Sequence, residues 1–448
     1  MAVSAILAVA LLTAAATVGL VPWPRREPVG VSGVVIAAAL GLLGFSLADL
    51  AARLLTLPPE AGPLLVGGAG AAVTLWRLRR RDLRLRPPSG EGSGGGRWSG
   101  VLVLLYLAPL LAAGLRMGTG PWPAMFFNVD TAHYMTQVQA LLRSDALPPP
   151  SLNNLGYAVP YHYGVQTAVA LLSRLSGLPP HTAAFLVVMP LMGAGIAAAA
   201  WRFAEAGRRT GGVPHALLLA LLLFPLVLFK GGLLRRIAVW ADPDPAVFAD
   251  KLFHGLLTGI YPMMSQLAGF FLALLLLYVL LWWPRRRGEV MAVLLVGAVS
   301  WFKPSYLVPL GSVFGAVALW RAYRGRSLRP LLAPALALAV ALAVRQVTFP
   351  ESRVAIVVGL AALEENGKLL LGVLELALVY GLVALLLAGL GRAVPWPVAA
   401  GVAVPFLLSS FLGVANLDLD GRPVLTKDFA QTLQLAPIFM AAMLAYAT

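Results

Sequence analysis

Residues 263–283 have the sequence MMSQLAGFFLALLLLYVLLWW, which contains no charged side chain, and Arg285, Arg286 and Arg287 follow almost immediately. A transmembrane helix needs about 20 mostly apolar residues to cross a hydrocarbon core of about 30 Å. The stretch therefore predicts a membrane-spanning helix that ends at a basic membrane surface.

Thirteen stretches of this kind occur along the chain, and they predict an all-α polytopic integral membrane protein with about 13 transmembrane helices. They cover residues 3–21, 30–48, 61–77, 99–116, 181–203, 213–230, 263–283, 289–303, 305–321, 328–345, 369–390, 395–415 and 433–447. The first lacks a basic n-region and a small-residue cleavage site, so we expect a retained helix rather than a signal peptide.

The composition of the 448 residues excludes an ordinary soluble domain. Hydrophobic residues make up 59% and charged residues 12%, against about 45–50% and about 25% in soluble domains. The formal net charge of +15 suits an anionic partner, but the apolar composition favours the lipid bilayer over nucleic acid. The chain has no cysteine, which excludes disulfides and thiolate chemistry.

The distribution of basic residues predicts the orientation in a bacterial cytoplasmic membrane. If the helices alternate, one side carries 20 of the 34 Lys and Arg but only five of the 19 acids, and the other side balances 14 against 14. Basic residues gather on the cytoplasmic side of membrane proteins. We therefore expect the N-terminus outside and the C-terminus inside.

A Gly- and Ser-rich segment divides the chain. Residues 87–98 predict a flexible cytoplasmic linker between three leading helices in 1–86 and a transmembrane core in 99–345, with further helices in 346–448. Polar residues of the core gather in two external loops, 117–180 and 231–262. We expect short interfacial helices in these loops, and any chemistry on this external face.

The first external loop contains the acid that is best placed for catalysis. Residues Thr131 to Leu142 are apolar at helical spacing, and Asp130 stands at the expected N-cap, within one turn of His133 and Tyr134. A carboxylate beside groups that hydrogen-bond a substrate suits a general base. The alternative is that Asp130 only caps the helix and His133 lies among lipid headgroups.

The same loop continues with Pro160-Tyr161-His162-Tyr163-Gly164, which precedes an amphipathic stretch ending at Gly177. Aromatic rings with polar edges suit both the apolar face and the hydroxyls of a sugar. Aromatic residues also anchor proteins at the membrane surface without any other role, and this alternative stays open.

An acid shortly after an early span, opening a long external loop with a short helix on the membrane, resembles the GT-C superfamily of polytopic glycosyltransferases. The Asp-x-x-His-Tyr and Pro-Tyr-His-Tyr-Gly stretches carry the resemblance, over roughly residues 99 to 345. It implies transfer of a sugar from a polyprenyl-phosphate or polyprenyl-diphosphate carrier to an acceptor, with Asp130 as the catalytic or acceptor-orienting acidic residue of the first loop. Three spans precede the one that should be first, and Asp130 lacks the adjacent second acid of many members.

The second external loop offers a metal site. Asp242 and Asp244 each precede a proline, which favours an extended chain in which both carboxylates face the same way. Such a pair suits Mg²⁺ or Mn²⁺ with phosphate oxygens completing the shell, and oligosaccharyltransferases of the GT-C superfamily use a similar pair. The alternative is a Pro-Asp turn followed by an ion pair of Asp250 and Lys251.

Several cations lie on the external face, where the positive-inside rule disfavours them: Lys230, Arg235, Arg236 and Lys303. Such cations often extend to lipid headgroups. They are also what holds a lipid phosphate leaving group at the membrane surface, and charges at this depth are functional candidates.

The leading hypothesis is therefore an inverting glycosyltransferase on the extracytoplasmic face. Asp130 deprotonates a glycan or lipid acceptor, and the external cations or a metal on Asp242 and Asp244 hold the departing polyprenyl phosphate. The remaining predicted substrate-binding residues are His133, Tyr134, Tyr161, His162 and Tyr163. One alternative is a secondary transporter or flippase, which needs ionisable residues at mid-membrane, and another is a non-enzymatic assembly protein.

Overall fold

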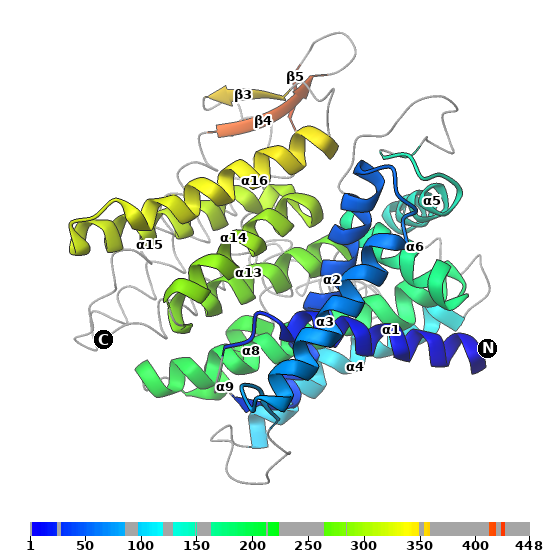
Figure 1. Cartoon of the computed structure of the whole chain (residues 1–448), viewed down its shortest axis with the longest axis horizontal. Helices are drawn as coiled ribbons and strands as arrows, with labels where there is room; N and C mark the ends of the chain where they lie inside the picture. Colours follow the sequence, from blue (N-terminus) through cyan, green and yellow to red (C-terminus); the bar gives the residue numbers. More distant parts are fainter. Residues whose placement is uncertain are drawn as a thin grey trace, which may run out of the picture.

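The chain is mostly helical (Figure 1). The computed structural model describes residues 2–24, 28–85, 97–119, 129–147, 149, 163–211, 214–223, 264–283, 285–348, 354–358, 412–417 and 423–425. The helices are α1 Ala2–Leu20, α2 Val31–Leu54, α3 Ala61–Arg79, α4 Arg97–Thr119, α5 Val129–Arg143, α6 Gly164–Ser176, α7 Pro180–Thr182, the π-helix η2 Ala183–Val188, α8 Met189–Gly211, α9 His215–Leu223, α13 Met264–Trp282, α14 Arg285–Phe302, the 3₁₀-helices η3 Pro304–Tyr306 and η4 Arg329–Leu331, α15 Leu307–Gly325 and α16 Leu332–Thr348.

Four of the described helical stretches are long and apolar enough to cross a membrane: Ala2–Leu20, Val31–Leu54, Pro180–Arg209 and Arg329–Gln346. Trp98–Ala112 and Gln266–Trp282 are apolar but shorter. The chain is therefore a membrane protein with several apolar helices, while the total of 13 spans stays a prediction. The predicted spans 369–390 and 433–447 lie outside the described residues.

The expectation of an all-α chain needs one correction, because short strands accompany the helices. Strands β1 (Pro28–Val29) and β2 (Arg84–Leu85) pair in parallel. Strands β3 (Val354–Val358), β4 (Leu412–Leu417) and β5 (Pro423–Leu425) form an antiparallel sheet, drawn above α16 in Figure 1. Residues 412–415 therefore belong to a strand, where they pair with β3, and not to the predicted span 395–415.

Helix α2 holds the described bundle together, since it packs against α1, α3, α6 and α8. Its approach to α1 is close enough to require glycine. A Cβ on Gly41 would lie 1.7 Å from the carbonyl oxygen of Ala15, and one on Gly19 would lie 1.9 Å from that of Ala37. Small residues allow such contacts between membrane helices, where van der Waals packing drives association. Of the leading helices, α1 contacts α6 of the core, and α2 contacts α6 and α8.

The long-range polar contacts join residues that the predicted alternation puts on the same side of the membrane. At the cytoplasmic end, Ser99 Oγ lies 2.9 Å from His215 Nδ1, and Arg321 donates to the carbonyl oxygen of Leu280. At the external end, Arg174 pairs with Glu60. These contacts agree with alternating spans, and the assignment of the two sides stays a prediction.

Helix α6 is buried in the bundle, whereas we expected an interfacial helix in this segment. Nearly all of its side chains are buried, including those of Gln166, Thr167 and Ser173. It packs against α1, α2, α5, α13 and α14 rather than lying on the surface of the bundle. The amphipathic pattern of this segment therefore reflects burial against other helices.

Candidate functional site

Helix α5 carries the predicted catalytic acid. It starts at Val129, so Asp130 is its second residue and not the cap that precedes it. An acid in the first turn is stabilised by the positive end of the helix dipole. Tyr134, one turn later, is 2% exposed and joins the core. The side chains of Asp130 and His133 lie outside the described part of the structure.

The Pro-Tyr-His-Tyr-Gly motif enters the core at its last two residues. Tyr163 is buried immediately before α6, and Gly164 is the first residue of that helix. A Cβ on Gly164 would lie 2.4 Å from Cδ1 of Phe302, so only glycine fits here without a shift. Burial raises the pKa of the Tyr163 phenol, which therefore stays protonated at neutral pH. Tyr161 and His162 lie outside the described residues.

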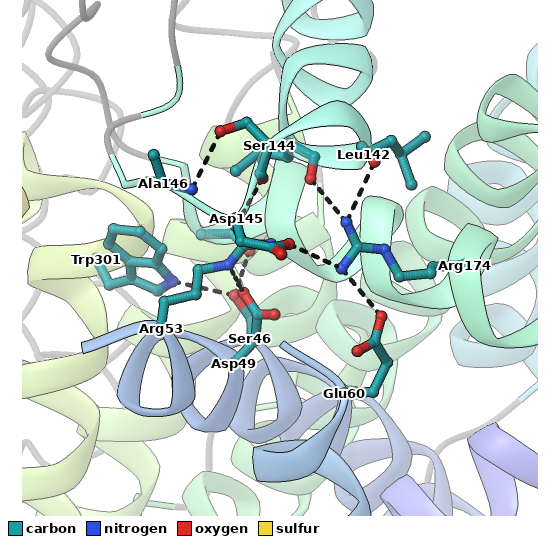
Figure 2. Close-up of polar contacts among 12 residues, drawn as sticks. Ser46, Asp49, Arg53, Glu60, Leu142, Ser144, Asp145, Ala146, Arg174 and Trp301 are labelled. Atoms are coloured by element: carbon teal, nitrogen blue, oxygen red, sulfur yellow. Dashed lines mark hydrogen bonds and ion pairs between the residues drawn. The ribbon is translucent and has the colours of Figure 1, made fainter. Parts of the chain in front are cut away.

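Ser46 of α2 joins this motif to the end of α14. Its hydroxyl donates to the carbonyl oxygen of Gly164 at 2.6 Å, and Nε1 of Trp301 donates to the same hydroxyl at 3.0 Å (Figure 2). The side chains of Ser46 and Trp301 are fully buried. At this junction Gly164, the last residue of the aromatic motif, therefore meets the same hydroxyl as Trp301, which lies two residues before the predicted cation Lys303.

Lys303 lies at that junction and is buried, with 2% of its surface exposed. Pro304 cannot continue α14 as an ordinary helical residue, so the helix ends at Phe302 and a 3₁₀ turn begins at Pro304. The aliphatic stem packs tightly, since a Cβ on Gly269 of α13 would lie 2.8 Å from the Cβ of Lys303. The side chain does not extend to the protein surface as a headgroup-seeking lysine does.

Buried amides lie next to this junction. Nε2 of Gln166 donates to Oε1 of Gln137 at 2.8 Å, which links α6 to α5. Three buried oxygens have no hydrogen-bond partner within the described part of the chain: Gln166 Oε1, Thr167 Oγ1 and Gln266 Oε1. Because an unmet buried acceptor is costly, these positions suit a water or the hydroxyls of a ligand.

A charged cluster lies at the end of the bundle that is predicted to be external (Figure 2). Arg53 Nε and Asp49 Oδ2 of α2 are 2.8 Å apart, and their side chains are only 3% and 2% exposed. Arg174 of α6 pairs with Glu60 at 3.0 Å and more distantly with Asp145 at 3.6 Å. These contacts connect the leading helices to the first external loop.

This cluster and the buried glutamines were not predicted from the sequence. A signal for Asp49 and Arg53 was present, because an acid and a base four residues apart share one helix face and sit here at the end of an apolar span. The pairing of Arg174 with Glu60 joins residues 114 positions apart. No local pattern indicates such a contact.

The other predicted site residues cannot be located. Lys230, Arg235, Arg236, Asp242 and Asp244 lie outside the described residues. Among the residues that are described, no group of three or more His, Asp or Glu side chains is arranged to hold a metal ion. The Mg²⁺ or Mn²⁺ site therefore stays a prediction.

Part of the chain is similar to a known family of membrane proteins. Residues 50–255 match the family described as "Uncharacterized membrane protein (DUF2298)". The matched segment is somewhat less than half of the chain, and it includes the whole first external loop and most of the second. No curated protein and no solved structure matches the chain.

Proposed function

We propose that this membrane protein is a GT-C-like glycosyltransferase that uses a polyprenyl-phosphate-linked sugar. Asp130 takes the proton of an acceptor hydroxyl, whose oxygen bonds to the anomeric carbon as the bond from that carbon to the phosphate oxygen breaks. The reaction inverts the anomeric centre. Polyprenyl phosphate leaves with its charge held by Lys303, by the cations of the second loop, or by a metal on Asp242 and Asp244.

The observation that supports this proposal is the junction of Gly164, Ser46 and Trp301. It joins the end of the aromatic motif to a buried lysine at the break between α14 and η3. A fixed cation in a desolvated position stabilises a developing phosphate charge more strongly than one in water. The unpaired acceptors on α6 and α13 suit sugar hydroxyls, and α5 contacts α6 along this face.

Replacement of the proposed base tests the reaction directly. We expect Asp130→Asn to lower sugar transfer at least about 100-fold, because the amide cannot accept the acceptor proton. The measurement is release of polyprenyl phosphate in membranes supplied with a panel of polyprenyl-phosphate sugars. Glu364→Gln, which changes another acid on the predicted external side, is the matched control and should leave the rate unchanged. Wild-type transfer by a folded Asp130→Asn variant would contradict the mechanism.

A transporter or flippase is the second candidate, because the buried pair of Asp49 and Arg53 in an apolar helix is a feature of such proteins. The pair lies in the last two turns of α2 and not at its middle. Transport predicts movement of the lipid-linked sugar across proteoliposome membranes without release of polyprenyl phosphate. Transferase activity predicts release of polyprenyl phosphate, so one assay separates the two.

A further inference from the structure

The C-terminal end of α5 is held by two arginines from two other helices. Nη2 of Arg174 donates to the carbonyl oxygens of Leu141 at 3.1 Å and Leu142 at 3.3 Å. Nη1 of Arg53 donates to the carbonyl oxygen of Ser144 at 3.0 Å. The last carbonyls of a helix lack partners within it, and cations near them interact favourably with the helix dipole. The two guanidinium groups therefore cap α5.

Carboxylates fix both arginines in turn (Figure 2). Asp49 holds Arg53 from one turn earlier on α2, and Glu60, which directly precedes α3, holds Arg174. The first pair is almost fully buried, and the second is about a quarter exposed. Because Asp49, Arg53 and Glu60 all belong to the α2–α3 hairpin, the leading helices determine where α5 ends.

The other end of α5 carries Asp130. Asp130 lies 13 residues before Arg143, the last residue of α5, or about 20 Å away along the helix axis. A helix of this length moves as one element, so contacts that fix its last turn also fix the direction of its first. We propose that Arg53 and Arg174 are positioning residues for the acid on α5, and that the leading helices are a working part of the enzyme.

The chemical consequence of this inference rests on the proposed function, whereas the capping of α5 does not. The test therefore has two readouts on Arg53→Met and Arg174→Met, made in the full-length chain. Hydrogen–deuterium exchange should rise at least about tenfold in the amides of residues 133–143 and stay unchanged in α13 and α14. In the transfer assay, kcat should fall by about 10- to 100-fold with little change in KM for the donor, because misplacement of a catalytic group affects the reaction step.

Two further variants separate positioning from general destabilisation. Arg174→Lys keeps a cation at the end of α5 and should restore most of both readouts. Arg209→Met removes an exposed partner of Glu205 at the other end of the bundle and should change neither. Wild-type exchange in α5 of the folded Met variants, or raised exchange with unchanged kcat, overturns the proposal. A wild-type chain without transferase activity overturns the proposed function. The hydrogen–deuterium exchange then still tests whether Arg53 and Arg174 cap α5.

Discussion

Lys303 is a buried cation close to the aromatic motif. Burial of an ammonium group carries a desolvation penalty, and replacing buried charges with apolar residues of similar size is often neutral or stabilising. Under the proposed function, a lysine with 2% exposure beside the aromatic motif is a candidate for binding an anionic ligand.

Lys303→Met tests this role by removing the charge while keeping most of the volume. We expect binding of polyprenyl phosphate to weaken by roughly 10- to 100-fold, the range for losing a charged hydrogen bond. Equilibrium binding to the purified protein measures the effect, with thermal unfolding as a check on folding. Arg321→Met, at the opposite end of the bundle, should bind as the wild type does. Unchanged affinity in Lys303→Met would exclude the lysine from phosphate recognition.

Substitution of Gly164 tests how tightly the junction with Phe302 is packed. Gly164→Ala should lower the free energy of unfolding by about 1–3 kcal/mol, because the added methyl overpacks against the ring of Phe302. Gly311→Ala on α15 is the matched control, since a Cβ there meets nothing within 4 Å. It should be neutral or stabilising by about 0.5–1 kcal/mol, as in other helix interiors. Equal effects of the two substitutions would contradict this account of Gly164.

At the scale of elements, the sequence predicts helices well and their partners poorly. The apolar stretch 263–283 and the periodic stretch 131–142 correspond to α13 and α5 within two residues, because local hydrophobicity and spacing determine helix formation. The burial of α6 was not predictable, since an amphipathic pattern looks the same whether its apolar face meets lipid or protein.

For the candidate site, the sequence indicated single residues whose roles stay predictions, and it did not indicate their contacts. Gly164 and Lys303 stood out through their neighbours in the sequence, but only the fold brings them together. Ser46 carries no signal of its own, because serine is common in membrane helices. The contact of Trp301 with Ser46 spans 255 positions, and a single sequence holds no information about such pairs.

Substitution of Ser46 tests whether the three helices are coupled, since its hydroxyl connects α2, α6 and α14. Ser46→Ala should cost about 1–3 kcal/mol of unfolding free energy, because it leaves Nε1 of Trp301 and the Gly164 carbonyl buried without this partner. In a Trp301→Phe background the same change should cost less, and the difference measures the coupling. Thr13→Ala removes an exposed hydroxyl on α1 and should have little effect. Strict additivity would show that the three helices are not coupled through Ser46.

At the scale of the whole molecule, the net charge of +15 gains a structural meaning. If the helices alternate, the excess charge lies on the cytoplasmic side, and the external charges of the first loop pair with those of the leading helices. Lipid-linked chemistry at the external end requires this arrangement, because Asp130, the aromatic motif and Lys303 must share one side of the membrane.

The absence of native cysteine makes that arrangement directly measurable. Leu57, after α2, and Leu328, after α15, are both exposed and uncharged, so a cysteine at either position leaves the charge balance that sets orientation intact. A membrane-impermeant maleimide on intact cells should label Leu57→Cys and spare Leu328→Cys, while both should react after permeabilisation. Labelling of Leu328→Cys in intact cells would reverse the assigned sides. Labelling of both in intact cells would contradict the predicted alternation of the transmembrane helices. Asp130 and Lys303 would then no longer be expected to contact the same substrate.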